Sequence, residues 1–260
     1  MRKAILVLGG TADARRIADT LILDGYKVIY SVAALLRAPK LDCDIVSGGF
    51  TQFGGLTQYL NEHSIGLVVN ATHPYAAQMS CKAVAASIET KVQIWHLLRP
   101  AWQPTEQDLW YTYRNEEELL TMLNSYRRPL LSAGKMTQSF IHNVANKGSI
   151  KQVLWRTAAM PNFDLPAHVI WEKAVGPFDR EEELALLKRF QVDVIVSKNT
   201  GGTTTSAKLE AARELSIPVL LHQRPKLSQA TCTFKSVSEL ISALRRQYPM
   251  SSALQQKAQQ

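Results

Sequence analysis

Short apolar runs alternate with amphipathic segments along most of the chain. The first run, Ala4–Leu8, is followed by a Gly-Gly-Thr turn and then by a helix that gathers Ile17, Ala18, Leu21 and Ile22 on one face. Further strands are predicted at KVIYSV, IGLVVN and KVQIWHLL, with helices near 55–61 and 75–88. This alternation is typical of α/β proteins, in which helices cover a parallel sheet.

The pattern is interrupted around RPAWQPTEQD, where proline and polar residues indicate a crossing between domains. A second series follows, with strands at LWYTY, PLLSA, SIKQVLWR, HVIWEKA, VDVIV and IPVLLH. Helices are predicted over 116–124, 179–190, 203–215 and 236–247. We therefore predict an α/β fold of two Rossmann-like domains with open, mostly parallel sheets and an interdomain cleft. The expected ranges are 1–100 for the N-terminal domain, 101–248 for the C-terminal domain and 249–260 for a disordered tail.

Composition and charge narrow the class of protein. The chain is 46% hydrophobic and carries a net charge of +8, so a sizeable core and an anionic partner are expected. The basic residues are dispersed and no nucleic-acid-binding motif is found, which favours a small anionic ligand over nucleic acid. No signal-like or membrane-length apolar run is present. Cys43, Cys81 and Cys232 lack CxxC spacing and are expected to be buried, so a cytoplasmic location without membrane partners is predicted.

Four predicted strands end in turns of unusual composition. The turns lie at 9–11, 70–74, 132–135 and 197–202. Ligands of open parallel sheets bind beyond the carboxyl ends of the strands, because loops and helix N-termini converge there. The four turns are therefore the candidate binding positions, although each taken alone is also compatible with an ordinary connection.

The turn at Gly9, Gly10 and Thr11 is a candidate phosphate site, because glycines let backbone amides approach an anion at the start of a helix. The stretch GGTADA lacks the GxGxxG pattern, so a structural turn is an equal alternative. The next strand ends without the acidic residue that holds the ribose of NAD. Ser31, with Arg37 nearby, favours a cofactor that carries a 2′-phosphate.

The stretch ATHPYA places a histidine and a tyrosine after a buried strand. His73 precedes a proline, which keeps it out of the helical region, and it could bind an anion, move a proton or only cap the turn. The other histidines are scattered, so a metal site has little support. Neither a GxSxG elbow nor a Walker A loop is present, which argues against hydrolases and kinases.

Taken together, five stretches resemble the precorrin-6A and cobalt-precorrin-6A reductase family of cobalamin biosynthesis. They are LVLGGTADAR, VVNATHPYAAQMS, LLRPAW, GPFDREEELALLKRFQVDVIVSKNTGG and KLEAARELSIPVLLHQRP, which occur in family order between residues 6 and 225. The sequence departs from the family at Asp13, where glutamate is frequent, at Asn70, where aspartate is usual, and at SAGKM, which replaces a TGR-like turn and puts the role of Lys135 in doubt.

The resemblance implies an oxidoreductase that uses NADPH to reduce one double bond of the macrocycle, with hydride delivered to C19, converting precorrin-6A to precorrin-6B. A polycarboxylate ring suits a basic site. The residues expected to bind NADPH are Gly9, Gly10, Thr11, Arg15, Ser31 and Arg37. Those expected to bind the substrate are Thr72, Arg99, Lys135, Ser197, Lys198, Asn199, Thr200, Gly201, Gly202 and Arg224. His73 and Tyr75 are candidates for proton delivery, with water as the alternative.

Two other functions remain open at this point. One is the cobalt-precorrin-6A reductase of the anaerobic pathway, which performs the same chemistry on a metallated ring and often uses NADH. The other is a two-domain protein that binds an anionic ligand without catalysis. Which loops face the cofactor and which face the substrate is also open.

Overall fold

The computed structural model describes residues 3–33 and 40–249. Arg37 and residues 250–260 of the expected tail lie outside the described residues. The chain divides into two compact units. The first unit contains the residues up to Pro100 and those from Pro225 onwards, and the second runs from Ala101 to Arg224.

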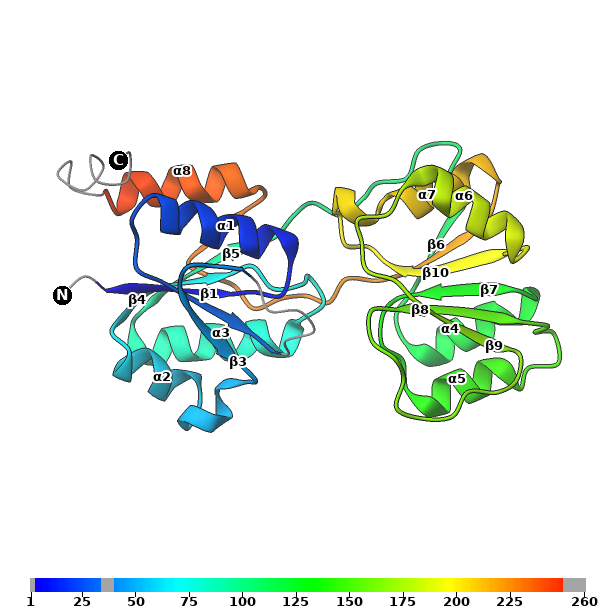
Figure 1. Cartoon of the computed structure of the whole chain (residues 1–260), viewed down its shortest axis with the longest axis horizontal. Helices are drawn as coiled ribbons and strands as arrows, with labels where there is room; N and C mark the ends of the chain where they lie inside the picture. The colour runs from blue at the N-terminus through cyan, green and yellow to red at the C-terminus, as the bar shows by residue number, and fades with distance from the viewer. Residues whose placement is uncertain (1–2, 34–39, 250–260) are drawn as a thin grey trace. The chain divides into compact units, whose positions relative to one another are not determined.

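The first unit is a six-stranded sheet in which every pair of neighbouring strands is parallel. The strand order is β12-β5-β4-β1-β2-β3, with β1 Ala4–Leu8, β2 Val28–Val32, β3 Asp44–Ser47, β4 Ile65–Asn70, β5 Gln93–Leu97 and β12 Cys232–Phe234. Helices α1 (Ala12–Leu23) and α8 (Val237–Gln247) cover one face, and α2 (Leu56–Glu62) and α3 (Ala77–Thr90) cover the other (Figure 1). A 3-10 turn, η1 (Phe50–Phe53), precedes α2.

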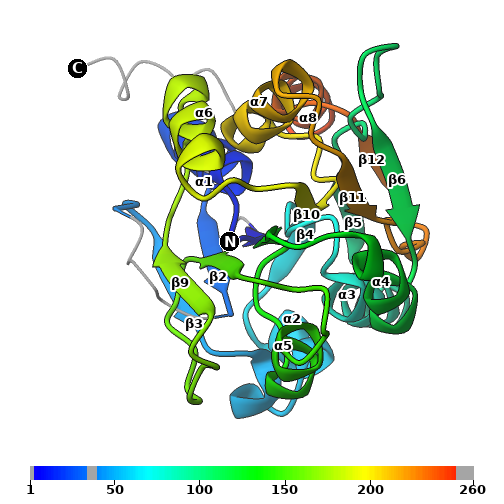
Figure 2. The same cartoon turned by 90° about the vertical axis from the view of Figure 1, so that its right-hand side faces the viewer.

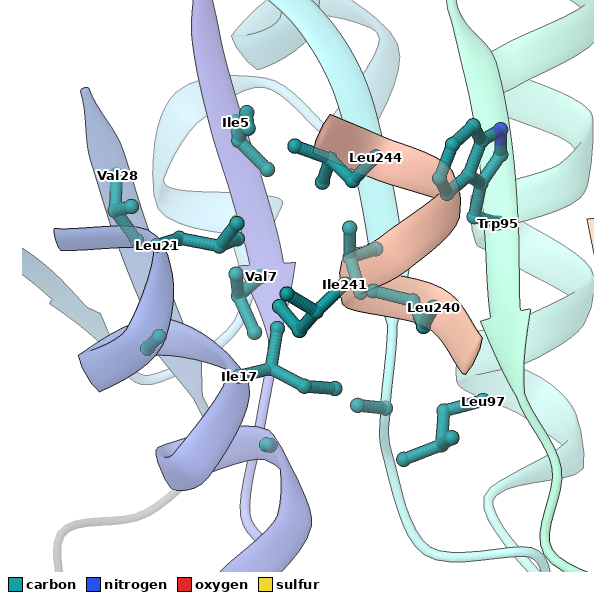
Figure 3. Close-up of a cluster of buried hydrophobic side chains, with 14 of the residues drawn as sticks. Ile5, Val7, Ile17, Leu21, Val28, Trp95, Leu97, Leu240, Ile241 and Leu244 are labelled. Atoms are coloured by element: carbon teal, nitrogen blue, oxygen red, sulfur yellow. The ribbon is translucent and has the colours of Figure 1, made fainter. Parts of the chain in front are cut away.

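Because helices cover both faces of this sheet, the central strands are apolar throughout rather than alternating. All five residues of β1 are buried. Val7 packs toward α1 and α8, where Ile17 and Ile241 lie beside it (Figure 3). The neighbouring residue Leu6 points to the opposite face, which α2 and α3 cover. The α/β pattern of the sequence is thus confirmed by the packing of both faces.

The second unit is also a six-stranded parallel sheet, in the order β6-β11-β10-β7-β8-β9. Its strands are β6 Trp110–Tyr113, β7 Pro129–Ser132, β8 Val153–Thr157, β9 Val169–Lys173, β10 Val194–Lys198 and β11 Val219–His222. Helices α4 (Glu116–Met122) and α5 (Gln138–Ala145) pack on one face (Figure 2). Helices α6 (Arg180–Arg189) and α7 (Ala207–Glu214) pack on the other. The 3-10 turns η2 (Leu123–Ser125) and η3 (Thr203–Thr205) complete the unit.

The expected extent of the second domain, 101–248, is wrong at its C-terminal end. Strand β12 pairs with β5 of the first sheet, through the register Thr233↔His96. Helix α8 buries Leu240 and Leu244 in the core beside α1. The chain therefore leaves the first unit, builds the second, and returns to complete the first. Periodicity identified the helix near 236–247 but carries no information about which sheet it covers.

Three elements were not predicted. Strand β3 has only four residues, two of them apolar but adjacent, and is mostly exposed at the edge of its sheet, so it has no apolar alternation. Strand β12 has only three residues. Helix α5 lies between predicted strands and begins at the Thr137 cap, whose side chain accepts a hydrogen bond from the Phe140 amide. The expectation that all three cysteines are buried is also wrong, because Cys81 is exposed on α3 and Cys43 and Cys232 are only partly buried.

Candidate functional site

Each sheet has one position where the chain reverses the direction in which it adds strands. In the first unit this position lies between β1 and β4, because β2 and β3 extend the sheet on one side and β5 and β12 extend it on the other. In the second unit it lies between β7 and β10. Ligands of open α/β sheets bind at such switch points, beyond the carboxyl ends of the strands. The four turns selected from the sequence are the loops that follow these four strands.

Tyr30 determines the geometry of the glycine turn after β1. A Cβ on Gly9 would lie 2.2 Å from Cζ of the Tyr30 ring, so this position requires glycine for packing. The Gly10 amide donates a hydrogen bond to the Tyr30 hydroxyl, at 3.0 Å. Gly10 has φ +100°, which favours glycine, and a Cβ there would meet nothing within 4 Å. The turn therefore leaves open space beside Gly10, while the amide itself is directed at Tyr30.

Thr11 joins the two loops of the first switch point. Its hydroxyl oxygen accepts a hydrogen bond from the Ala14 amide at 3.0 Å, and so caps the N-terminus of α1. The same hydroxyl donates to the carbonyl oxygen of Ala71, at 2.8 Å, in the loop after β4. Residues that the sequence analysis selected separately are thus brought together. Open space at Gly10 beside a capped helix N-terminus fits the pyrophosphate of a dinucleotide in this first-unit loop.

A buried carboxylate occupies the first turn of α1. Asp13 forms ion pairs with Arg16 and with Arg99, whose Nη1 lies 2.7 Å from Asp13 Oδ2. Arg99 follows β5 and was predicted to bind substrate, so part of its guanidinium is used to neutralise Asp13. Of the remaining residues predicted to bind the cofactor, Arg15 is exposed on α1, and the Ser31 carbonyl accepts the Gly9 amide at 2.7 Å.

The loop after β4 is held by internal hydrogen bonds. The Thr72 hydroxyl and amide both donate to Asn70 Oδ1, at 2.7 and 3.2 Å. The Tyr75 amide donates to Nδ1 of His73 at 3.3 Å, so the proton of the neutral His73 ring is on Nε2. The rings of His73 and Tyr75 lie 5.6 Å apart. His73 therefore both caps the turn and keeps one ring nitrogen as a hydrogen-bond donor.

In the second unit, Lys198 brings together the loops after β7 and β10. Its Nζ lies 3.7 Å from the position that a Cβ on Gly134 would occupy, which places the ammonium group in contact range of the loop after β7. Burial lowers the pKa of Lys198 from its usual 10.5. Lys135, the next residue after Gly134, is exposed. Of the two predicted lysines, Lys198 is thus the one that the fold places over the neighbouring loop.

Asn199 has a defined structural role in the second unit. Its Oδ1 accepts the Trp102 amide at 2.8 Å, and its Nδ2 donates to the Trp102 carbonyl at 3.0 Å. Arg224 Nε donates to the Asn199 carbonyl oxygen at 2.6 Å. Trp102 and Arg224 stand near the two ends of the unit. Both ends are therefore attached to the loop after β10.

The remaining predicted residues of this loop form its turn. The Thr200 hydroxyl lies 3.1 Å from that of Thr205. Gly201 has φ +68°, in the left-handed region, and Gly202 is buried. Ser197 is buried at the end of β10, and its hydroxyl donates to the Lys198 carbonyl oxygen at 3.3 Å.

A buried charge cluster in the second unit was not predicted. Arg156 on β8 forms a bidentate ion pair with Glu183 on α6, at 2.6 and 3.0 Å. The Phe178 ring covers the guanidinium, 4.5 Å from Cζ. Lys208 on α7 is 4% exposed, and burial, together with the charge of Arg156, lowers its pKa to about 8. No sequence motif marks these residues, which come from three separate elements.

Tyr30, Asn70 and His96 were also missed as residues that shape the first switch point. Asn70 was noted only as a departure from the family pattern, and His96 only as one of the scattered histidines. Within residues 3–33 and 40–249, no cluster of three or more His, Cys, Asp or Glu side chains could hold a metal ion. Over the same ranges, no helix has the length and apolar character needed to cross a bilayer.

Comparisons with known proteins agree over nearly the whole chain. The family model described as precorrin-6x reductase CbiJ/CobK matches residues 4–245. The chain is 35% identical over 246 residues to the precorrin-6A reductase of Rhodococcus erythropolis, which covers 92% of this chain and 96% of that protein. It is 27% identical over 253 residues to the cobalt-precorrin-6A reductase of Priestia megaterium, which covers 94% and 98%. A solved structure, CobK precorrin-6A reductase, matches with a TM-score of 0.86 and 31% identity, over 96% of this chain and 99% of that one.

Proposed function

Since the chain belongs to the precorrin-6x reductase family, we propose that it reduces precorrin-6A to precorrin-6B with NADPH as the hydride donor. Reduction of a carbon–carbon double bond of the macrocycle in cobalamin biosynthesis is the activity of this family. The observation that carries the proposal is the family match across both units, because it includes all four switch-point loops. When bound, the dihydronicotinamide supplies the hydride, which we assign to C19 of the ring.

We assign the NADPH site to the loop after β1, with Gly9, Gly10 and Thr11 at the pyrophosphate and Arg15 beside it. The open space at Gly10 and the N-terminus of α1 support this assignment. The end of β2 supports NADPH over NADH, because it carries Ser31 rather than an acidic residue. In this site the chain orients the cofactor and excludes water from it.

We assign the carboxylates of the macrocycle to Lys198, Lys135 and Arg224 in the second unit and to Arg99 and Thr72 in the first. The remaining loop residues of the second unit, Ser197, Asn199, Thr200, Gly201 and Gly202, form the turn that presents Lys198. Cationic donors suit a ligand with many acetate and propionate groups, since charge-assisted hydrogen bonds are the strong ones. The half-buried position of Lys198 over Gly134 supports it as the principal contact.

The proton that accompanies the hydride is assigned to His73, with Tyr75 as its neighbour. Nδ1 of His73 accepts the Tyr75 amide, so the neutral ring carries its proton on Nε2. Water is the alternative donor, and a His73→Gln variant distinguishes the two. If His73 delivers the proton, kcat falls and its dependence on pH changes, whereas a water donor leaves both unchanged.

The choice between a metal-free and a cobalt-containing ring is made on similarity. The identity of 35% to a precorrin-6A reductase, against 27% to a cobalt-precorrin-6A reductase, supports the metal-free substrate. Parallel assays with precorrin-6A and cobalt-precorrin-6A, each with NADPH and with NADH, test this choice. A larger kcat/KM for the metallated ring would reverse it.

The experiment that tests the function is a reduction assay with the purified protein and precorrin-6A. We expect one NADPH to be oxidised for each macrocycle reduced, with loss of the substrate's colour as its conjugation is shortened. Binding of the macrocycle without NADPH oxidation would instead indicate a protein that binds the anionic ligand without catalysis.

A further inference from the structure

A buried hydrogen-bonded network lies beneath the loop that follows β4. Asn70, Ser80 and His96 are 4%, 1% and 3% exposed. Strand register places His96 of β5 directly beside Asn70 of β4. The Asn70 Nδ2 atom lies 2.9 Å from Ser80 Oγ and 3.1 Å from His96 Nε2. Together with the two bonds from Thr72 to Oδ1, four groups converge on one side-chain amide.

The orientation of this amide is determined by chemistry. The backbone amide of Thr72 can only donate a hydrogen bond, so the Asn70 atom that faces it is the oxygen. The other atom is therefore the nitrogen, and its two hydrogens point to Ser80 Oγ and to His96 Nε2. His96 Nε2 must then accept, which places the proton of a neutral imidazole on Nδ1. Burial lowers the pKa of His96, which agrees with a neutral ring.

All four hydrogen-bonding positions of Asn70 are thus used. The amide nitrogen is fixed by α3 and β5, and the oxygen fixes Thr72. The residue after Thr72 is His73, whose ring is held in turn by the Tyr75 amide. The position of the His73 ring therefore depends on a side chain that does not reach the loop surface.

We propose that Asn70 and His96 are positioning residues of the reductase, which hold Thr72 and His73 in place through the buried Asn70 amide. The inference rests on the proposed function, because it assigns the loop after β4 to substrate binding and proton delivery. Neither residue contacts the reacting atoms. Their effect is exerted through the Thr72 hydrogen bonds, and it requires a hydrogen bond between the side chains at positions 70 and 96, in which Asn70 donates and His96 accepts in the wild type.

The test compares variants that keep or remove the acceptor for Thr72. Asn70→Leu removes it, and we expect kcat for precorrin-6A to fall about tenfold, equal to about 1.4 kcal/mol, with little change in KM for NADPH. Asn70→Asp keeps an oxygen toward Thr72, with Ser80 and His96 as donors, and kcat stays within a few fold of the wild type. The matched control is Ser87→Ala on α3, the helix that also carries Ser80. It removes the hydrogen bond from the Ser87 hydroxyl to the Val92 carbonyl oxygen, away from the loop.

His96 is tested by a pair of substitutions. Gln at position 96 offers an oxygen that can accept from Asn70, whereas Leu does not. We expect His96→Leu to lower kcat and His96→Gln to restore most of it, with both proteins folded by circular dichroism. Equal kcat values for the two variants would overturn the role of His96.

The positioning role has a readout that does not need catalysis. Hydrogen exchange of the Thr72 amide should be faster in Asn70→Leu than in the wild type and in Ser87→Ala. If Asn70→Leu retains wild-type kcat, or if Ser87→Ala lowers kcat equally, the proposal is wrong. If the wild type has no reductase activity, the proposed function fails. An unchanged Thr72 exchange rate in Asn70→Leu would separately overturn the positioning role of Asn70.

Discussion

Replacing Lys208 with methionine should stabilise the protein. The side chain of Lys208 is buried beside the Arg156–Glu183 pair, which is already balanced in charge. Lowering its pKa from 10.5 to about 8 means that the folded state opposes the charged form. A shift of this size corresponds to about 3 kcal/mol at about 1.4 kcal/mol per unit of pKa. Methionine has a similar length and no charge, so Lys208→Met should raise the free energy of unfolding at pH 7 by up to about 3 kcal/mol.

The dependence on pH gives a sharper test. Between about pH 8 and pH 10.5 the unfolded chain keeps the Lys208 proton and the folded chain loses it. The free energy of unfolding contributed by this group therefore rises with pH across that window. The penalty is complete below pH 8. The advantage of Lys208→Met over the wild type should consequently be largest at pH 7 and shrink toward pH 10.

The assay is urea unfolding of both full-length proteins followed by tryptophan fluorescence. Trp102, Trp110, Trp155 and Trp171 all belong to the second unit, so the signal reports mainly on the unit that contains Lys208. Taking the difference between the two proteins at each pH cancels the titration of other groups. A Lys208→Met protein that is less stable than the wild type at pH 7, with a difference that does not vary with pH, would refute the reasoning.

Three further outcomes are expected. Lys198→Ala should raise KM for precorrin-6A by about tenfold, as expected for loss of a charge-assisted hydrogen bond, whereas the exposed Lys135→Ala has a smaller effect. Equal KM values for these two variants would remove Lys198 from the site. Because burial lowers the pKa of Lys198, its ammonium group loses its proton below pH 10.5, so KM of the wild type should also rise as the pH is raised toward that value. Tyr30→Phe removes the acceptor of the Gly10 amide and should lower the free energy of unfolding by about 1 kcal/mol, measured by urea unfolding. The affinity for NADPH, measured by titration calorimetry, should not fall. Gly9→Ala should lower Tm by an amount equivalent to about 1–3 kcal/mol, because its Cβ would overlap the Tyr30 ring, and an unchanged Tm would contradict that contact.

The sequence was informative where structure is local. The apolar run of β1 and the one-sided helix after it were predicted because helix and strand periodicities are short-range. The four loops could be selected because unusual turn residues follow buried strands. The predicted range 101–248 placed α8 and the residues of the unpredicted strand β12 in the wrong unit, since pairing of β12 with β5 is made through backbone groups and depends on the path of the whole chain.

The contacts that shape the candidate site were less accessible from the sequence. Asn70 and His96 are 26 positions apart and become neighbours only through strand register. The glycine at position 9 was interpreted as a possible approach to phosphate, whereas the Tyr30 ring also requires it. Both interpretations predict the same residue, so only the position of the tyrosine on the next strand distinguishes them.

The attachment of Trp102 and Arg224 to Asn199 has a consequence for the origin and engineering of the protein. The second unit is, in gene terms, an insertion between β5 and β12 of the first, and its two ends are joined at a single residue. An insertion closed in this way can be accepted by a host fold with little loss of chain entropy, because its ends need no long linker. The same arrangement makes the second unit exchangeable as a whole. The junctions at 101 and 224 are the places at which the unit of one family member can be replaced by that of another.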